Sequence, residues 1–83
     1  MSAHVEPIRA LLLHLATNLV DRPEQVRVEA HSGHGGTTFE VHVAEGDAGK
    51  VIGKHGRIAE ALRLVAKAAA LKHGAKVFVE IAS

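Results

Sequence analysis

The residues best suited to chemistry lie in one segment, VIGKHGRI, which occupies residues 51–58. Two glycines stand three positions apart in it, and each permits a backbone conformation or a close approach that a Cβ would prevent. If a helix begins at the second glycine, its unpaired N–H groups and the positive end of its dipole face the loop. That geometry favours phosphate. Lys54 and Arg57 would add positive charge to it, and His55 would add a donor whose charge depends on pH.

The predicted contacts extend from this loop into its flanks. Hydrogen bonds to charged groups contribute about 1.5–3 kcal/mol each, so two or three of them support weak binding of a polyanion. Lys50 adds charge at the periphery, and the aliphatic residues suit the floor of a groove. Bases commonly stack on aromatic rings, but the chain has no Tyr or Trp, so base contacts would be apolar and sequence-tolerant. The predicted site residues are Gly53, Lys54, His55, Gly56, Arg57, Lys50, Val51, Ile52 and Ile58.

A purely structural role for the two glycines, as caps in a helix–turn–helix connector, is the alternative. That role does not explain why Lys54 and Arg57 gather where a helix begins. Positive charge there opposes the helix dipole at a cost of about 0.3–1 kcal/mol per group. A bound anion would relieve this repulsion, which favours the functional interpretation.

Periodic hydrophobic patterns predict the elements that hold the loop. Residues 5–20 repeat apolar side chains at helical spacing, and Pro23 follows the end of that segment. Residues 24–30 and 37–43 alternate apolar with polar side chains, which is typical of half-buried strands. The glycine-rich stretch 31–36 between them predicts a flexible hairpin loop rather than a tight turn.

The pattern changes period again around the loop. Asp47 is the expected N-cap of a short helix that ends near Ile52. A second helix is predicted from about Gly56 to Lys72, and residues 76–82 alternate as a third strand. The buried face of the second helix is predicted at Ile58, Ala61, Leu62, Val65 and Ala69. The element order is therefore α-β-β-α-α-β, an α+β fold in a single domain spanning residues 1–83.

Composition limits the class of protein further. Formal net charge is +1, so attraction to a polyanion must come from local clusters of cations. The chain has no cysteine, which fits a reducing compartment. The apolar N-terminal stretch lacks the basic region and cleavage site of a signal peptide, and no segment reaches the roughly 20 apolar residues of a membrane span. We therefore expect a cytoplasmic protein with no membrane contact.

Seven histidines raise the question of a metal site. His31, His34 and His42 could meet across the predicted hairpin, and zinc accepts imidazole ligands. However, their spacing matches no structural zinc pattern and no cysteine accompanies them, so we predict no metal and no other cofactor. No Ser or Thr has an evident His/Asp partner, and the carboxylates are scattered. We predict no catalytic residues and no enzymatic activity.

The segment VIGKHGRI resembles the signature of KH domains, in which an aliphatic pair precedes G-x-x-G. The similarity extends over LVDRPEQVRVE, over VAEGDAGKVIGKHGRIAEALRLVAKAAA and over KVFVEI, and so covers nearly the whole chain. These segments resemble the stand-alone bacterial KH proteins of the KhpA family. The residues that match the family's loop are Gly53, Lys54, His55 and Gly56. Relatives often carry an uncharged polar residue at the position of His55.

This resemblance implies a type II KH fold, with a three-stranded sheet packed against three helices and the loop carried by a helical hairpin. It implies binding of single-stranded RNA in the cytoplasm, and a role as an RNA chaperone. Family members form homodimers and pair with a larger KH-containing partner, KhpB. Through RNA they influence cell-wall synthesis and cell length in some bacteria, and the resemblance extends that expectation to this chain.

Two alternatives stay open. The second long helix is rich in alanine. These alanines either reflect helix propensity alone or form a flat patch for a second subunit; they are Ala66, Ala68, Ala69 and Ala70. Leu11 and Leu13 also leave room for a dimer surface on the first helix. The second alternative concerns function. The low net charge and the absence of Tyr and Trp also fit a protein-interaction subunit that contacts RNA only incidentally.

Overall fold

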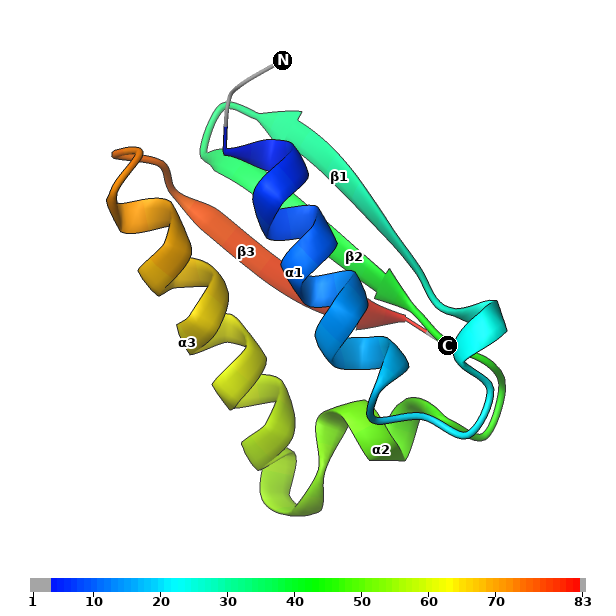
Figure 1. The fold of residues 1–83 in the computed structure, drawn as a ribbon. Coiled ribbons are helices and arrows are strands. Elements are labelled where there is room, and N and C mark those ends of the chain that lie inside the picture. The colour runs from blue at the N-terminus through cyan, green and yellow to red at the C-terminus, as the bar shows by residue number, and fades with distance from the viewer. Residues whose placement is uncertain (1–3, 83) are drawn as a thin grey trace.

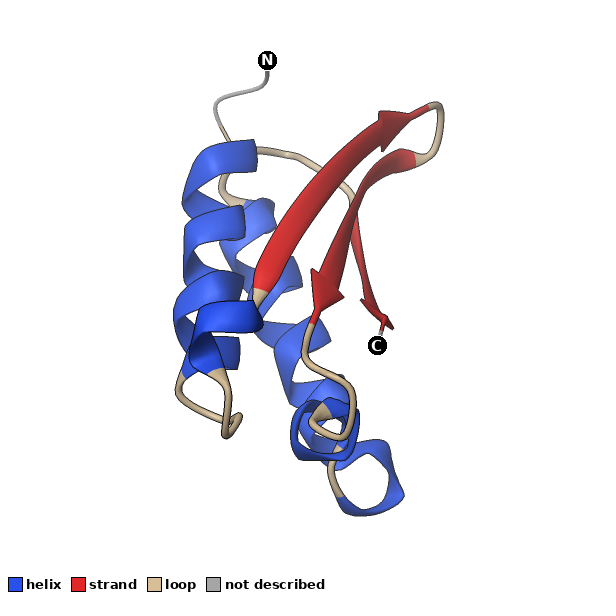
Figure 2. Ribbon diagram, turned by 90° about the vertical axis from the view of Figure 1, so that its right-hand side faces the viewer, coloured by secondary structure: helices blue, strands red, loops and turns tan. Residues whose placement is uncertain are grey.

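A three-stranded sheet forms the base of the fold, with two long helices across one of its faces and a short helix near one end of the strands (Figures 1 and 2). The computed structural model describes residues 4–82. The strands are β1 (Arg27–Gly33), β2 (Gly36–His42) and β3 (Val77–Ala82), and the helices are α1 (Val5–Thr17), α2 (Ala48–Ile52) and α3 (Arg57–Leu71). Single 3-10 turns occupy Pro23–Gln25 and Lys54–Gly56. The predicted α+β class and the predicted order α-β-β-α-α-β are confirmed.

The sheet is mixed, with β2 in the centre. β1 pairs with β2 antiparallel and β3 pairs with β2 parallel, so the long α2–α3 connection joins the two parallel strands. Alternate residues of the strands face the helices, because successive side chains in a strand point to opposite faces. Phe39 and Val41 of β2 are fully buried against Ile8 and Leu12 of α1 in the same core cluster. The opposite face of the sheet, which we call the outer face, is covered by no helix of residues 4–82 (Figure 2).

The buried face of α3 differs from the predicted one. Its core residues are Ala59, Leu62, Ala66 and Ala70, whereas Val65 is 40% exposed and Ala61 is also exposed. The prediction was right at Leu62 and wrong at Ala61 and Val65, while Ile58 and Ala69 are partly buried against the core. The observed stripe of mostly small residues keeps a helical spacing of three or four, and small side chains let a helix lie close to a sheet. Ala66 and Ala70 therefore belong to the core of this chain and are not available to a second subunit.

The β1–β2 hairpin is tighter than the sequence indicated. β1 begins at Arg27, after the 3-10 turn, and continues through Ser32 to Gly33, which pairs with Gly36. His34 and Gly35 alone form the turn, so the prediction of a flexible loop over residues 31–36 was wrong. Glycines at both strand ends tolerate such a tight connection; Gly36, for example, has φ +136° and lies against the Lys76 backbone, where a Cβ would come within 2.3 Å of a carbonyl oxygen.

Two helix boundaries also depart from the prediction. α1 ends at Thr17, where the hydroxyl of Thr17 and the amide of Asn18 both donate to the His14 carbonyl, at 2.9 and 2.7 Å. In a longer helix the His14 carbonyl would accept a backbone N–H, whereas here it accepts hydrogen bonds from these two side chains. Asp47 precedes α2, but its side chain does not cap that helix. Instead its Oδ2 accepts the Arg22 backbone N–H at 3.1 Å. Among the described residues, no helix has the length and apolar character to cross a membrane.

Candidate functional site

The loop between α2 and α3 lies at the end of the molecule opposite the β1–β2 turn (Figure 1). α2 ends at Ile52, and Gly53 leaves the helix with φ +79° and ψ 173°. A 3-10 turn follows, in which the Gly56 N–H donates to the Gly53 carbonyl at 3.1 Å. Gly56 has φ +73° and directly precedes α3. The two glycines therefore hold the loop in a conformation that most other residues would resist.

Gly53 is needed for space as well as for its dihedral angles. A Cβ at this position would lie 2.6 Å from Cγ1 of Ile58, which packs beneath the loop. Gly56 differs, because a Cβ there would meet no atom of the described residues within 4 Å. The side of the loop at Gly56 therefore faces open space, where a ligand can approach the backbone.

His55 lies at the tip of the loop in the left-handed region, with φ +58°. It is the one residue other than glycine with positive φ among residues 4–82. This conformation costs an L-residue about 1–2 kcal/mol, and such strain is concentrated at functional sites.

The three basic side chains of the loop surround one shallow hollow. Lys54, His55 and Arg57 are all exposed and line a cavity of about 290 Å³. No side chain of the described residues caps the N-terminus of α3, which starts at Arg57. The positive end of the helix dipole therefore meets three cationic or titratable side chains. This arrangement can bind an anion such as a phosphate group.

The predicted flanking residues divide into different environments. Ile52 is 40% exposed and stands beside the loop, where its side chain is available to a ligand. Val51 is fully buried in the core, so the prediction that it lines the groove floor was wrong. Adjacent residues of a helix point about 100° apart, and α2 uses Val51 to anchor itself on the core. Ile58 is partly buried and supports Gly53 from below.

Lys50 is held differently from the other cations. Its Nζ lies 3.2 Å from Oδ2 of Asp21, in the connector after α1, and 4.0 Å from Oδ1 of Asp47. These acidic partners compensate its charge, so Lys50 adds little to the attraction of an anion at the loop. Sequence reasoning missed this pairing because Asp21 lies far from Lys50 along the chain.

A second hollow, which the sequence analysis did not identify, lies between α3 and the free edge of β3. It has a volume of about 260 Å³ and is lined by Arg63, Lys67 and residues 77–80. The Arg63 Nε donates to the Val79 carbonyl at 3.2 Å, and the Lys76 ammonium lies 5.8 Å from the Phe78 ring centroid. Phe78 is 42% exposed and supplies an aromatic surface. The sequence does contain a signal for this surface. Arg63 and Lys67 are four residues apart, and residues at this spacing are neighbours on one side of a helix.

Comparison with known proteins agrees with this architecture. A family model described as the KH domain of KhpA/KhpB matches residues 9–81. The chain belongs to this family. It is 49% identical over 74 residues to the RNA-binding protein KhpA of Clostridium perfringens, which covers 89% of this chain and 99% of the relative. It is 51% identical over 71 residues to the RNA-binding protein KhpA of Caldanaerobacter subterraneus, covering 86% of this chain and 95% of the relative.

A third relative, the RNA-binding protein KhpA of Clostridium acetobutylicum, is also 49% identical over 74 residues, with the same coverage as the protein from Clostridium perfringens. No solved structure gives a significant match. The resemblance to the KhpA family stated from the sequence is confirmed. KhpA/KhpB is not an enzyme family, which agrees with the prediction of no enzymatic activity.

Proposed function

We propose that this chain binds single-stranded RNA through the loop Gly53-Lys54-His55-Gly56. The observation that carries the proposal is the strained, outward-facing loop, which places exposed cations at the uncapped N-terminus of α3. Three relatives of nearly full coverage are named RNA-binding proteins, which supports RNA as the polyanion. KH domains clamp a short stretch of nucleotides with this kind of loop.

In the proposed complex, the loop binds the RNA backbone and the surfaces beside it bind bases. The exposed side chains of Lys54, His55 and Arg57 would hold phosphates at the positive end of the α3 dipole. Ile52 offers an aliphatic surface beside the loop. The hollow between α3 and β3 adds the Phe78 ring, on which a base can stack. RNA bases would then contact an aromatic ring as well as an aliphatic side chain.

The test is fluorescence anisotropy of a short labelled single-stranded RNA with wild type and with Lys54→Asp/His55→Asp. The variant should lose binding, because two carboxylates would repel phosphate. Its fold should persist, because acidic residues suit a helix N-terminus and Asp, like His, is enriched in the left-handed region. Wild-type affinity should fall with salt, with a slope of about −1.4 if Lys54 and Arg57 each neutralise one phosphate.

The chain supplies a matched control for this experiment. The tripeptide Lys-His-Gly occurs twice, at residues 54–56 before α3 and at residues 72–74 after it. Lys72→Asp/His73→Asp makes the same change in charge at the opposite end of the helix, where the dipole does not favour phosphate. This control should keep its RNA affinity. Equal affinity of wild type and both variants would exclude the loop as the RNA-binding site.

We further propose, on the strength of the family, a role as a cytoplasmic RNA chaperone that forms homodimers and pairs with a KhpB-type partner. An influence on cell-wall synthesis and cell length belongs to the same proposal. An apolar surface on α3 supports association with protein: Leu64 is 63% and Leu71 is 77% exposed. The same surface favours the second candidate function, a protein-interaction subunit with incidental RNA contact. Partner binding that survives Lys54→Asp/His55→Asp in a protein without RNA affinity of its own would favour that candidate.

A further inference from the structure

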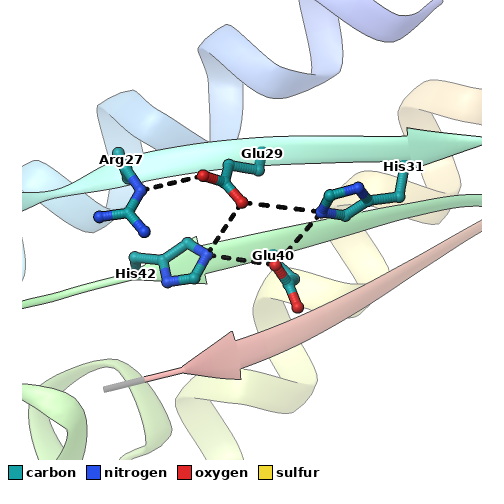
Figure 3. A network of polar contacts seen from close by, with 5 residues as sticks. All are labelled: Arg27, Glu29, His31, Glu40 and His42. Atoms are coloured by element: carbon teal, nitrogen blue, oxygen red, sulfur yellow. Dashed lines mark hydrogen bonds and ion pairs between the residues drawn. The ribbon is translucent and has the colours of Figure 1, made fainter.

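The outer face of the sheet carries a compact cluster of two imidazoles and two carboxylates, formed by His31, His42, Glu29 and Glu40 (Figure 3). Nε2 of His31 lies 3.2 Å from Oε1 of Glu40 and 3.7 Å from Oε1 of Glu29. Nε2 of His42 lies 3.2 and 3.4 Å from the same two oxygens. Four potential ligand atoms, one from each residue, thus form a closed ring.

Strand pairing brings the two carboxylates together, and Arg27 pairs with Oε2 of Glu29, the oxygen that lies outside the ring. Glu29 of β1 and Glu40 of β2 are direct cross-strand partners, and Glu80 of β3 is the next residue in the same row. Like charges placed directly opposite each other destabilise a strand pair. A cation bound between Glu29 and Glu40 would convert this repulsion into attraction.

The dimensions of the ring suit a transition metal. Zinc binds imidazole nitrogen at about 2.0–2.1 Å and carboxylate oxygen at about 2.0–2.2 Å in a tetrahedral arrangement, whose ligand atoms are about 3.3–3.6 Å apart. The four sides of the ring, from 3.2 to 3.7 Å, are close to these separations. Ligand atoms of Glu29, His31 and Glu40 also all lie within 4.8 Å of one another. His42 is not part of that group of three, so its imidazole would have to move closer to the other ligands for all four to bind one ion.

Within the cluster, hydrogen bonds link the imidazoles to only one of the two carboxylates, that of Glu40. Both imidazoles direct the same atom, Nε2, at the same oxygen, Oε1 of Glu40. Each is also within 3.7 Å of Glu29 Oε1, although one N–H can make only one good hydrogen bond. Arg27 Nε donates to the other oxygen of Glu29, Oε2, at 3.1 Å, and so orients this carboxylate with Oε1 toward the ring (Figure 3). Partners of this kind orient metal ligands in known sites.

We propose that Glu29, His31, Glu40 and His42 form a binding site for one divalent transition-metal ion of the zinc type. The ion would join β1 to β2 on the face of the sheet away from the helices. The proposal does not depend on RNA binding, because the cluster and the loop at residues 53–56 lie on different elements. It revises the prediction of no metal: of the three histidines considered, two meet at the cluster, while His34 lies in the turn.

The test is a calorimetric titration of the full chain with zinc chloride, with the fold of each variant checked by circular dichroism. Wild type should bind one equivalent of Zn²⁺. His31→Ala/His42→Ala should weaken binding by more than about tenfold, since even loss of an outer orienting partner costs 10–100-fold in known sites. The control His14→Ala/His34→Ala also removes two imidazoles, one on α1 and one in the turn, and should bind as wild type does.

Nuclear magnetic resonance of the imidazole nitrogens locates the bound ion. Zn²⁺ should shift Nε2 of His31 and His42. Several results would overturn the proposal: no binding by wild type at millimolar Zn²⁺, equal binding by His31→Ala/His42→Ala, or shifts confined to other histidines such as His4 and His73, whose rings are 6.2 Å apart. If the variant with alanines at the cluster lost its fold, Glu40→Gln would replace it, and this substitution should also weaken binding.

Discussion

At the scale of single residues, Gly53 shows how the loop depends on its neighbours. The residue combines φ +79° with a contact to Ile58 that leaves no room for a Cβ. A methyl group here has to displace the side chain that supports the loop from below. The signature glycine is therefore a packing requirement of the α2–α3 junction in addition to a point of backbone freedom, and the shape of the candidate RNA site depends on it.

We expect Gly53→Ala to lower the free energy of unfolding by about 1–3 kcal/mol, from the strained φ and from overpacking against Ile58. Urea denaturation measures this difference. Gly49→Ala in the adjoining helix is the matched control, because a Cβ there meets nothing within 4 Å among the described residues. Alanine is the better helix former, so the control should be neutral or stabilising by up to about 1 kcal/mol. Equal effects of the two substitutions would contradict the packing argument.

At the scale of elements, the connector after α1 and the start of α2 are joined by one buried carboxylate. Asp47 is 4% exposed, and its Oδ2 accepts the Arg22 backbone N–H across 25 residues of chain. Its Oδ1 lies 4.0 Å from the Lys50 ammonium, which in turn pairs with Asp21. These contacts position α2, and therefore the loop that follows it, relative to the rest of the fold.

Asp47→Ala should lower the free energy of unfolding by about 1–3 kcal/mol, because it leaves the Arg22 N–H without its acceptor. Asp47→Asn keeps an oxygen at the same place and should lose clearly less. Thermal or urea denaturation of both variants gives the comparison. If alanine and asparagine had the same effect, the hydrogen bond to Arg22 would not be what stabilises this junction.

At the scale of the whole molecule, three surfaces lie on different parts of the fold. The loop with Lys54, His55 and Arg57 stands at one end, the histidine–glutamate cluster lies on the outer face of the sheet, and apolar residues line the exposed side of α3. Ala61, Leu64, Ala68 and Leu71 share that side at a spacing of three and four, and all are exposed. An apolar helix face left in solvent is typical of an interaction surface.

The homodimer proposal predicts that wild type has twice the monomer mass in solution, and that Leu64→Glu is monomeric. A buried glutamate carboxylate in the interface would have no partner and would cost several kcal/mol. Light scattering coupled to size exclusion measures the mass. Leu19→Glu, at a residue that is 36% exposed in the connector after α1, is the control and should remain dimeric. A monomeric wild type at high protein concentration would refute the homodimer.

Some of the fold and site followed directly from the pattern of residues, and some did not. The strands around Val28, Phe39 and Val79 were predicted because alternation of side chains is a property of one segment alone. The buried face of α3 was mispredicted because several faces of that helix carry apolar residues, and only its packing against the sheet selects the one with Ala59 and Ala66. Val51 and Ile52 were both predicted to line the groove, because only the packing of α2 shows that Val51 faces the core and Ile52 faces solvent.

The sequence by itself determined the local features of this protein: the order of its elements, the glycines at the ends of α2 and α3, and the cations between them. These depend on residues close together in the chain. The tertiary structure alone decided which cation is compensated by a distant acid, as Lys50 is by Asp21, and which glutamates meet. Pairing from the predicted strand ends would have placed Glu29 opposite Thr38, whereas the two-residue turn places it opposite Glu40. Register is a relation between strands, and it follows from the turn that joins them.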